Sequence, residues 1–368
     1  MTHVTARRGF LKSAAGAATG IVFCGCGLLG PVRARAQGSR HPPVMLKGRR
    51  VRTIDVHSHC QFREVGDLLG EEGKKILNSA VRGGERAFIT LEERLGAMDA
   101  MGVDMEVLSV NPFWYGRDRD LAEKITTLQN EKLAELCASK PDRFAAFASL
   151  ALQFPDLAVR QLETAVRKQG LRGAAIGGTV GPDNFSDPKF HPVWAKAEEL
   201  GAVLFIHPQG LPELTQRLRG NGWLANGIGN PLETTIALEH LIFEGTLDRF
   251  PGLKIIAAHG GGYLPSYPDR FDHACEVGPA FCNAEIKLKK KPSEYLKHIY
   301  VDSLVFTPEA LTYLASRVGV SQIVLGSDHP FPWAEQPVDH VLATRALTDD
   351  DKAAILGGNA ERIFGMKA

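Results

Sequence analysis

The sequence of 368 residues has almost no net charge. It holds 43 lysines and arginines against 42 acidic residues, which gives a formal net charge of +1, and these charges are spread along the chain. It has no basic stripe of the kind that nucleic acid binding requires. The short basic run at residues 287–291 is expected to lie in solvent. Nucleic acid is therefore excluded as a partner.

Cysteine is also scarce, with six residues in the whole chain. Four of them, Cys60, Cys137, Cys275 and Cys282, lie beyond the first 36 residues, and none forms a C-x-x-C pair. This spacing predicts no disulfide framework. Strand alternation places the Cys60 side chain opposite to that of its neighbour His59, which favours a structural role for Cys60.

No apolar run reaches the 20 or so residues that a membrane span needs. A twin-arginine pattern at residues 6–12 is followed by an Ala- and Gly-rich stretch at 13–30 and by small residues at 34–36. These features predict a signal peptide over residues 1–36 and export to the periplasm, with no membrane association after cleavage. A lipid anchor on Cys26 is the alternative that the sequence favours less.

Residues 37–50 are interpreted as a linker, and residues 51–368 as one domain. Apolar strand-like runs alternate there with segments of helical periodicity. This alternation predicts an α/β fold of the (β/α)8 TIM-barrel type. The predicted strands cover residues 53–57, 105–110, 144–150, 173–177, 203–207, 254–259, 299–303 and 322–328. The predicted helices cover residues 91–101, 121–139, 156–169, 188–200, 231–244, 265–275 and 308–318, with a last pair at 349–356 and 359–364.

Metal-compatible side chains follow several of the predicted strands. His57 and His59 stand two residues apart at the first strand, so both side chains point to the same side. His207 ends the fifth strand and Asp328 the eighth. Parallel barrels build their active sites from the carboxyl ends of their strands. The sequence therefore predicts a metal centre with these four residues as ligands.

His259 ends the sixth predicted strand. Imidazole titrates near neutral pH, so His259 is predicted to act as an acid/base group beside the metal. The alternative is that His259 is itself a ligand. Three imidazoles and one carboxylate favour a single divalent ion, zinc first, with manganese or iron as alternatives.

Two segments are longer than ordinary barrel loops. Residues 61–90 follow the first predicted strand, and residues 208–230 follow the fifth. Loops of this length in a compact domain are usually functional or disordered. Each is therefore predicted to form a lid or a wall of the active-site pocket.

Several motifs carry a family resemblance that runs from about Ile54 to Gly365. The chain resembles the amidohydrolase superfamily, and within it the branch of aminocarboxymuconate-semialdehyde decarboxylase and related aromatic-acid decarboxylases. The motifs include Ile-Asp-Val-His-Ser-His at 54–59, Leu-Phe-Ile-His-Pro at 204–208, Ala-His-Gly-Gly-Gly at 258–262 and Leu-Gly-Ser-Asp-His-Pro-Phe-Pro at 325–332.

The resemblance implies a mononuclear zinc-type site on the same four residues, with His259 as the acid/base. The fourth strand ends in Ala174-Ala175-Ile176-Gly177 and lacks the lysine that bridges two metals in binuclear members. The implied reaction is decarboxylation of a small unsaturated or aromatic carboxylic acid through a metal-activated water. Hydrolysis of an ester, lactone or amide at the same site is the alternative.

The resemblance also implies arginines that grip substrate carboxylates through bidentate pairing. Arg270 matches an arginine that is donated across a dimer interface, so a homodimer is expected. Arg82 matches a second arginine, with Arg86 as its near competitor. The chain departs from the branch at His329, which stands where an aromatic residue follows the aspartate.

Overall fold

The computed structural model of the protein describes residues 40–77 and 88–366. The predicted signal peptide and the candidates Arg82 and Arg86 lie outside the described residues. Within the described part of the chain, no helix combines the length and the apolar character needed to cross a membrane.

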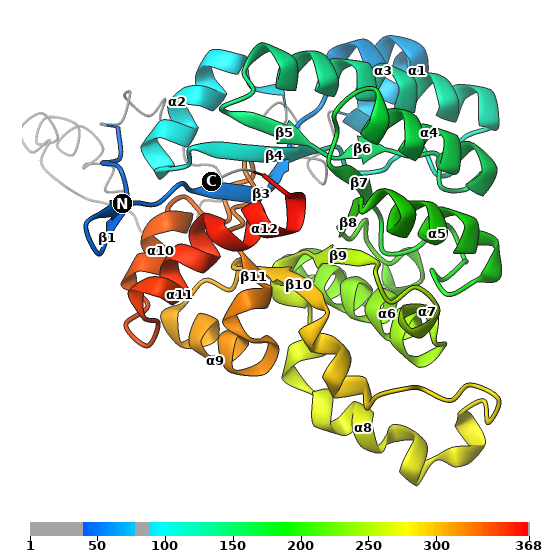
Figure 1. Cartoon of the computed structure of the whole chain (residues 1–368). Helices are drawn as coiled ribbons and strands as arrows, with labels where there is room; N and C mark the ends of the chain where they lie inside the picture. Colours follow the sequence, from blue (N-terminus) through cyan, green and yellow to red (C-terminus); the bar gives the residue numbers. More distant parts are fainter. Residues whose placement is uncertain (1–39, 78–87, 367–368) are drawn as a thin grey trace, which may run out of the picture. The chain divides into compact units, whose positions relative to one another are not determined.

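A barrel of parallel strands lies at the centre of the domain (Figure 1). Each strand pairs in parallel with the next, and bridges from Asp55 to Leu325 and from Ser58 to His329 join the first strand to the chain after the last. The predicted (β/α)8 fold is confirmed. Its strands are β3 (Ile54–His59), β4 (Met105–Ser109), β5 (Phe144–Ala146) with its continuation β6 (Ala148–Ser149), β7 (Gly173–Ile176), β8 (Val203–Ile206), β9 (Lys254–Ala257), β10 (Ile299–Asp302) and β11 (Ile323–Val324).

Helices surround the strands on the outside (Figure 1). Their ends follow local sequence signals. For example, α2 begins after Thr90, which forms a capping box with Glu93, and ends at Gly102 in the left-handed conformation. The helices are α1 (Arg63–Leu77), α2 (Leu91–Met101), α3 (Arg119–Ser139), α4 (Pro155–Arg167), α5 (His191–Leu200), α6 (Asn230–Phe243), α7 (Thr246–Arg249), α8 (Pro268–Val277), α9 (Pro308–Val318), α10 (Pro337–Ala343), α11 (Asp349–Ala353) and α12 (Asn359–Phe364).

The barrel interior is a packed apolar core. Phe147 and Phe205 stack at its centre with ring centroids 5.4 Å apart. Phe364 of α12 packs against Phe147 at 5.7 Å, so the last helix contributes to the interior core. Because side chains fill the interior, an active site can form only at the strand ends and in the loops that follow them.

Part of the first long loop is a helix that the sequence analysis missed. Helix α1 occupies residues 63–77 and packs against α3, with an ion pair of 2.9 Å between Glu64 and Lys132. The described residues of the 61–90 segment do not line the cavity described below, and residues 78–87 lie outside the described part of the chain, so the prediction of a lid or pocket wall stays a prediction. A short hairpin, β1 (Met45–Leu46) with β2 (Arg49–Arg50), lies inside the segment interpreted as a linker.

The sequence predicted no disulfide framework, and one local disulfide is found among the described residues. Cys275 and Cys282 are bonded, with their Cα atoms 5.8 Å apart. The bond closes a local loop at the end of α8, which is why no framework pattern in the sequence revealed it. Cys60 is a free thiol and buried, consistent with a structural role, and Cys137 is also free.

A substitution at Gly173 tests how tightly β7 and β8 pack. Its φ is +146°, and an added Cβ would lie 1.9 Å from the carbonyl oxygen of Val203. Gly173→Ala is expected to lower the free energy of unfolding by about 2–5 kcal/mol, through backbone strain and overpacking. Denaturant unfolding measures this loss.

Gly96 is the matched control for that substitution. It lies exposed in α2 with nothing within 4 Å of an added Cβ. Gly96→Ala is expected to raise the free energy of unfolding by up to about 1 kcal/mol through helix propensity. Equal effects at both glycines would contradict the packing described for β7.

Candidate metal centre

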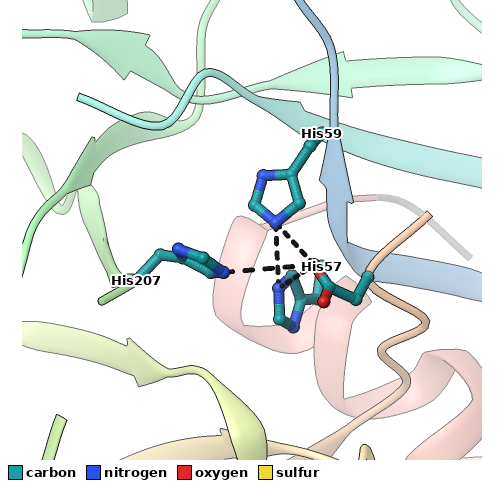
Figure 2. A group of neighbouring side chains, drawn as sticks. His57, His59 and His207 are labelled. Atoms are coloured by element: carbon teal, nitrogen blue, oxygen red, sulfur yellow. Dashed lines mark hydrogen bonds and ion pairs between the residues drawn. The ribbon is translucent and has the colours of Figure 1, made fainter. Parts of the chain in front are cut away.

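Strand β3 presents two histidines toward one point. All six of its residues are buried, and its pairing with β4 shifts register between Asp55 and Ser58. The Nε2 atoms of His57 and His59 lie 3.0 Å apart (Figure 2). The strand runs through His59, two residues beyond its predicted end, so both histidines belong to one element.

His207 and Asp328 complete a group of four buried side chains. One nitrogen or oxygen from each of His57, His59, His207 and Asp328 lies within 4.8 Å of the others. Asp328 Oδ1 is 2.9 Å from His59 Nε2, 3.2 Å from His57 Nε2 and 4.0 Å from His207 Nε2. Among the described residues this is the one cluster of at least three such side chains that could hold a metal.

The donor set fits a divalent ion. Both ring nitrogens of His207 are buried and have no hydrogen-bond partner. Buried polar atoms are normally satisfied, so unpaired ones that face a common point indicate a missing partner. Three imidazoles and a carboxylate are typical ligands of first-row divalent metals.

The electrostatics of the group also favour a bound cation. Burial lowers the pKa of His59 to about 4 and that of His207 well below its usual range, so both imidazoles stay neutral. Burial acts in the same direction on His57, but the Asp328 and Asp302 carboxylates outweigh it and raise that pKa to about 10. The negative charges of the Asp328 and Asp302 carboxylates therefore favour a positive charge beside them.

His259 lies beside the four residues but is not one of the group. It follows β9 in a short 3₁₀ turn, and its Nε2 is 4.0 Å from Asp328 Oδ2. His259 and Asp328 both have positive φ, at +57° and +64°. Non-glycine residues rarely adopt this conformation, and such residues cluster at functional sites. Asp328 lies in the turn beyond β11, not within the long strand that the sequence predicted.

Asp302, at the end of β10, was missed by the sequence analysis. Its buried carboxylate lies 2.7 Å from His57 Nδ1 and accepts hydrogen bonds from the backbone N–H groups of His259, Gly260 and Leu304. Asp302 thus orients one member of the group and fixes the turn that carries His259. Its position at the end of the seventh predicted strand was the signal that could have found it.

A buried ionic network contacts the backbone of the metal group at His59. Arg94 donates to Glu106 at 2.7 Å and to the carbonyl oxygen of His59 at 2.6 Å. The other Glu106 oxygen lies 2.7 Å from His329 Nδ1. Burial alone would raise the pKa of Glu106, but the charges of Arg94 and His329 lower it to about 2. His329, where the chain departs from the family pattern, is therefore paired with the buried Glu106 carboxylate.

Glu233 of α6 holds two loops at the edge of the site. Its buried carboxylate accepts hydrogen bonds from the backbone N–H groups of Gly178, Gln209 and Gly210, at 3.1, 2.8 and 2.6 Å. Burial outweighs these bonds and raises the pKa of Glu233 to about 7. The sequence did not reveal this role.

A cavity of about 70 Å³ opens next to His207 and Asp328. Residues of the 208–230 segment line it, which confirms the prediction of a pocket wall for that loop. Arg270 is exposed on α8 and does not line this cavity. Its assignment to a neighbouring subunit's site stays a prediction.

Comparison with known proteins finds several decarboxylases among the proteins that this chain resembles. The chain is 32% identical over 280 residues to 2-amino-3-carboxymuconate-6-semialdehyde decarboxylase of Dictyostelium discoideum, covering 74% of this chain and 76% of that protein. The crystal structure of 5-carboxyvanillate decarboxylase from Sphingomonas paucimobilis superposes with a TM-score of 0.76 at 27% identity, covering 86% of this chain and 100% of that one.

A third relative was solved with a metal. Dihydroxybenzoic acid decarboxylase from Polaromonas sp. JS666, with bound manganese and the inhibitor 2-nitroresorcinol, matches with a TM-score of 0.73 at 25% identity. The match covers 86% of this chain and 98% of that chain.

Fold and site together define an α/β-barrel enzyme with a centre for a divalent metal ion. The chain belongs to the amidohydrolase family, whose model matches residues 54–366. The resemblance inferred from the sequence motifs is confirmed.

Asp302→Asn tests the orientation of His57. The amide cannot accept all of the bonds that the carboxylate accepts, so metal affinity is expected to fall about 10- to 100-fold. A chelator competition titration measures it. Asp350→Asn, at an exposed ion pair with Lys47, is the control and should leave affinity unchanged. Wild-type affinity in D302N would contradict the role given to Asp302.

Glu106→Gln tests the buried network. Leaving Arg94 without its carboxylate is expected to cost about 3–5 kcal/mol of unfolding free energy. Because the folded pKa of Glu106 lies below its unfolded value of 4.5, its contribution is present above that value and is lost as the pH falls toward 2. Denaturant unfolding at several acidic pH values should therefore show the two proteins converging as the pH falls.

Glu64→Gln is the control, since Glu64 pairs with Lys132 at the surface. Its loss is expected to be at most about 1 kcal/mol. A pH-independent difference between wild type and E106Q would show that the Glu106 carboxylate is not the titrating group.

Proposed function

We propose that the chain is a metal-dependent carboxy-lyase that releases CO2 from a small unsaturated or aromatic carboxylic acid. The observation that carries the proposal is a single buried His57–His59–His207–Asp328 group with His259 beside it. The relatives described above are decarboxylases of such acids. Hydrolysis of an ester, lactone or amide at the same ligands is the competing reaction.

A mononuclear site is supported by the end of β7. Gly177 and Gly178 follow this strand, where a bridging lysine would have to stand. The backbone N–H of Gly177 donates to the Tyr115 hydroxyl and that of Gly178 to Glu233. This strand end therefore offers no lysine side chain to bridge a second metal.

His57, His59, His207 and Asp328 would hold the ion. A divalent metal bound there acts as a Lewis acid toward an oxygen of water or of the substrate. The ligand set favours zinc, whereas the Polaromonas relative was solved with manganese. We propose zinc, with manganese as the competitor that reconstitution has to test.

His259 supplies the proton in this proposal. The imidazolium gives its proton to the substrate carbon that bears the carboxylate. The bond between that carbon and the carboxylate then breaks, its electron pair restores the double bond that protonation removed, and CO2 leaves. His259 takes a new proton from solvent. Asp302 holds the His259 turn in place through backbone hydrogen bonds, at 2.8 Å each from His259 and Gly260.

We also propose a homodimer in which Arg270 binds a carboxylate in the partner's site. Its support is that Arg270 is exposed on α8 and does not line the cavity of its own chain. A guanidinium in this setting suits bidentate pairing with a carboxylate.

Export through the twin-arginine pathway is proposed as well. The signal-like sequence supports it, and so does the Cys275–Cys282 disulfide, because disulfides persist in oxidising compartments. Replacing Arg7 and Arg8 by lysine is expected to retain the protein in the cytoplasm. Fractionation with immunoblotting measures this, and equal periplasmic amounts of both proteins would contradict it.

The catalytic proposal is tested with holoenzyme reconstituted with zinc or manganese. A panel of hydroxybenzoic and unsaturated acids is assayed for CO2 and for the decarboxylated product. His259→Asn is expected to keep its metal and lose at least about 100-fold in kcat. His240→Asn is the control, since His240 pairs with Glu244 at the surface of α6.

Three results would contradict the proposed reaction or the role given to His259. Hydrolysed esters or lactones without CO2 would favour the hydrolase. Loss of metal from H259N would make His259 a ligand. Full activity in H259N would exclude it as the proton donor.

A further inference from the structure

His207 is held differently from the other two histidines of the metal group. His57 Nδ1 lies 2.7 Å from the Asp302 carboxylate, and His59 Nδ1 lies 2.9 Å from the Ser109 hydroxyl. Metal-binding histidines are usually oriented through such a contact of the second ring nitrogen. Neither ring nitrogen of His207 has a hydrogen-bond partner, although both are buried. The orientation of this ring must therefore come from its backbone and from the packing around it.

The pairing of β7 with β8 ends at the backbone of His207. The two strands pair in parallel up to Ile176 and Ile206. The N–H of His207 donates to the carbonyl oxygen of Ile176 at 2.9 Å. The next residue is Pro208, which has no N–H with which to continue the ladder. The strand pairing therefore holds His207 from one side only.

Glu233 of α6 takes over beyond His207. One of its carboxylate oxygens accepts a hydrogen bond from the N–H of Gly178, after β7. The other accepts from the N–H groups of Gln209 and Gly210, after β8. The Glu233 side chain is fully buried. One carboxylate thus joins the two chains just past the metal-group histidine, and it satisfies three backbone donors that the ladder leaves unpaired.

The space around this carboxylate is tight. A Cβ atom added at Gly178 would lie 2.5 Å from Glu233 Cγ and 2.6 Å from Oε1. Glycine at this position lets the backbone approach the carboxylate closely. The Glu233 side chain therefore has little room to shift, and the backbone groups that it binds are held in one arrangement.

We propose that Glu233 is the positioning residue for His207, and that it sets the metal-binding geometry of this histidine through the backbone. Asp302 has the corresponding role for His57, but acts on the ring itself. The role of Glu233 does not depend on which reaction the enzyme catalyses, so metal binding tests it without turnover.

Glu233→Gln keeps the shape of the side chain but turns an NH2 group toward backbone N–H donors. At least one of the three hydrogen bonds is then lost, and His207 is expected to shift. The affinity for Zn²⁺, measured by chelator competition, is expected to fall about tenfold. The visible absorption bands of the Co²⁺-loaded enzyme are expected to change in position and intensity, because they depend on the geometry of the ligands.

Gly178→Ala disturbs the same carboxylate from the other side and leaves Glu233 in place. It is expected to change the Co²⁺ spectrum and to lower Zn²⁺ affinity in the same direction. Gly227→Ala is the matched control, because an added Cβ meets nothing within 4 Å there. Glu213→Gln is the control for removal of a carboxylate from the 208–230 segment, since Glu213 is exposed. Both controls are expected to bind metal as wild type does.

Combination with His207→Ala shows whether Glu233 acts through that histidine. In the H207A background, E233Q is expected to leave the residual Zn²⁺ affinity unchanged, because the ligand that Glu233 positions is gone. An equal fall in affinity in both backgrounds would overturn the role given to Glu233. Wild-type Zn²⁺ affinity or an unchanged Co²⁺ spectrum in both E233Q and G178A would also overturn it, and would leave the carboxy-lyase reaction open.

Discussion

The Asp302 carboxylate is the constraint on which the metal centre depends. It joins β10 to His57 of β3 and to the turn after β9, so one buried charge sets the position of a metal-group histidine and of His259. A buried carboxylate is costly unless it is fully hydrogen-bonded, and here a ring nitrogen and three backbone groups satisfy it. The barrel makes this possible because parallel strands bring their carboxyl ends together.

A second layer of buried charge supports the same site. Arg94 contacts the backbone of His59 and pairs with Glu106, which also contacts His329, the neighbour of Asp328. Glu233 holds the chain after β7 and β8 through backbone amides. These networks leave the imidazoles and the carboxylate of the metal group with few other partners, so the group is arranged for a cation before one binds.

Much of this could be predicted from the sequence, since alternating strands and helices and the H-x-H spacing are local patterns. The four metal-group residues and His259 were found because each ends or follows an apolar strand. Asp302 also ends a predicted strand, but its role depends on a contact with a residue 245 positions away. Glu106 and Arg94 carry no such local signal, and their roles likewise depend on tertiary contacts. The left-handed turns at His259 and Asp328 and the bond between Cys275 and Cys282 likewise arise from tertiary packing.

The most direct test of the account is the metal stoichiometry of the purified protein, by mass spectrometry, in wild type and in His207→Ala. The buried ring nitrogens of His207 have no hydrogen-bond partner, so its loss should act chiefly on metal binding. The account predicts about one zinc or manganese ion per chain in wild type and a large loss in the variant. Two ions per chain, or the same single ion in both proteins, would contradict the mononuclear centre described here.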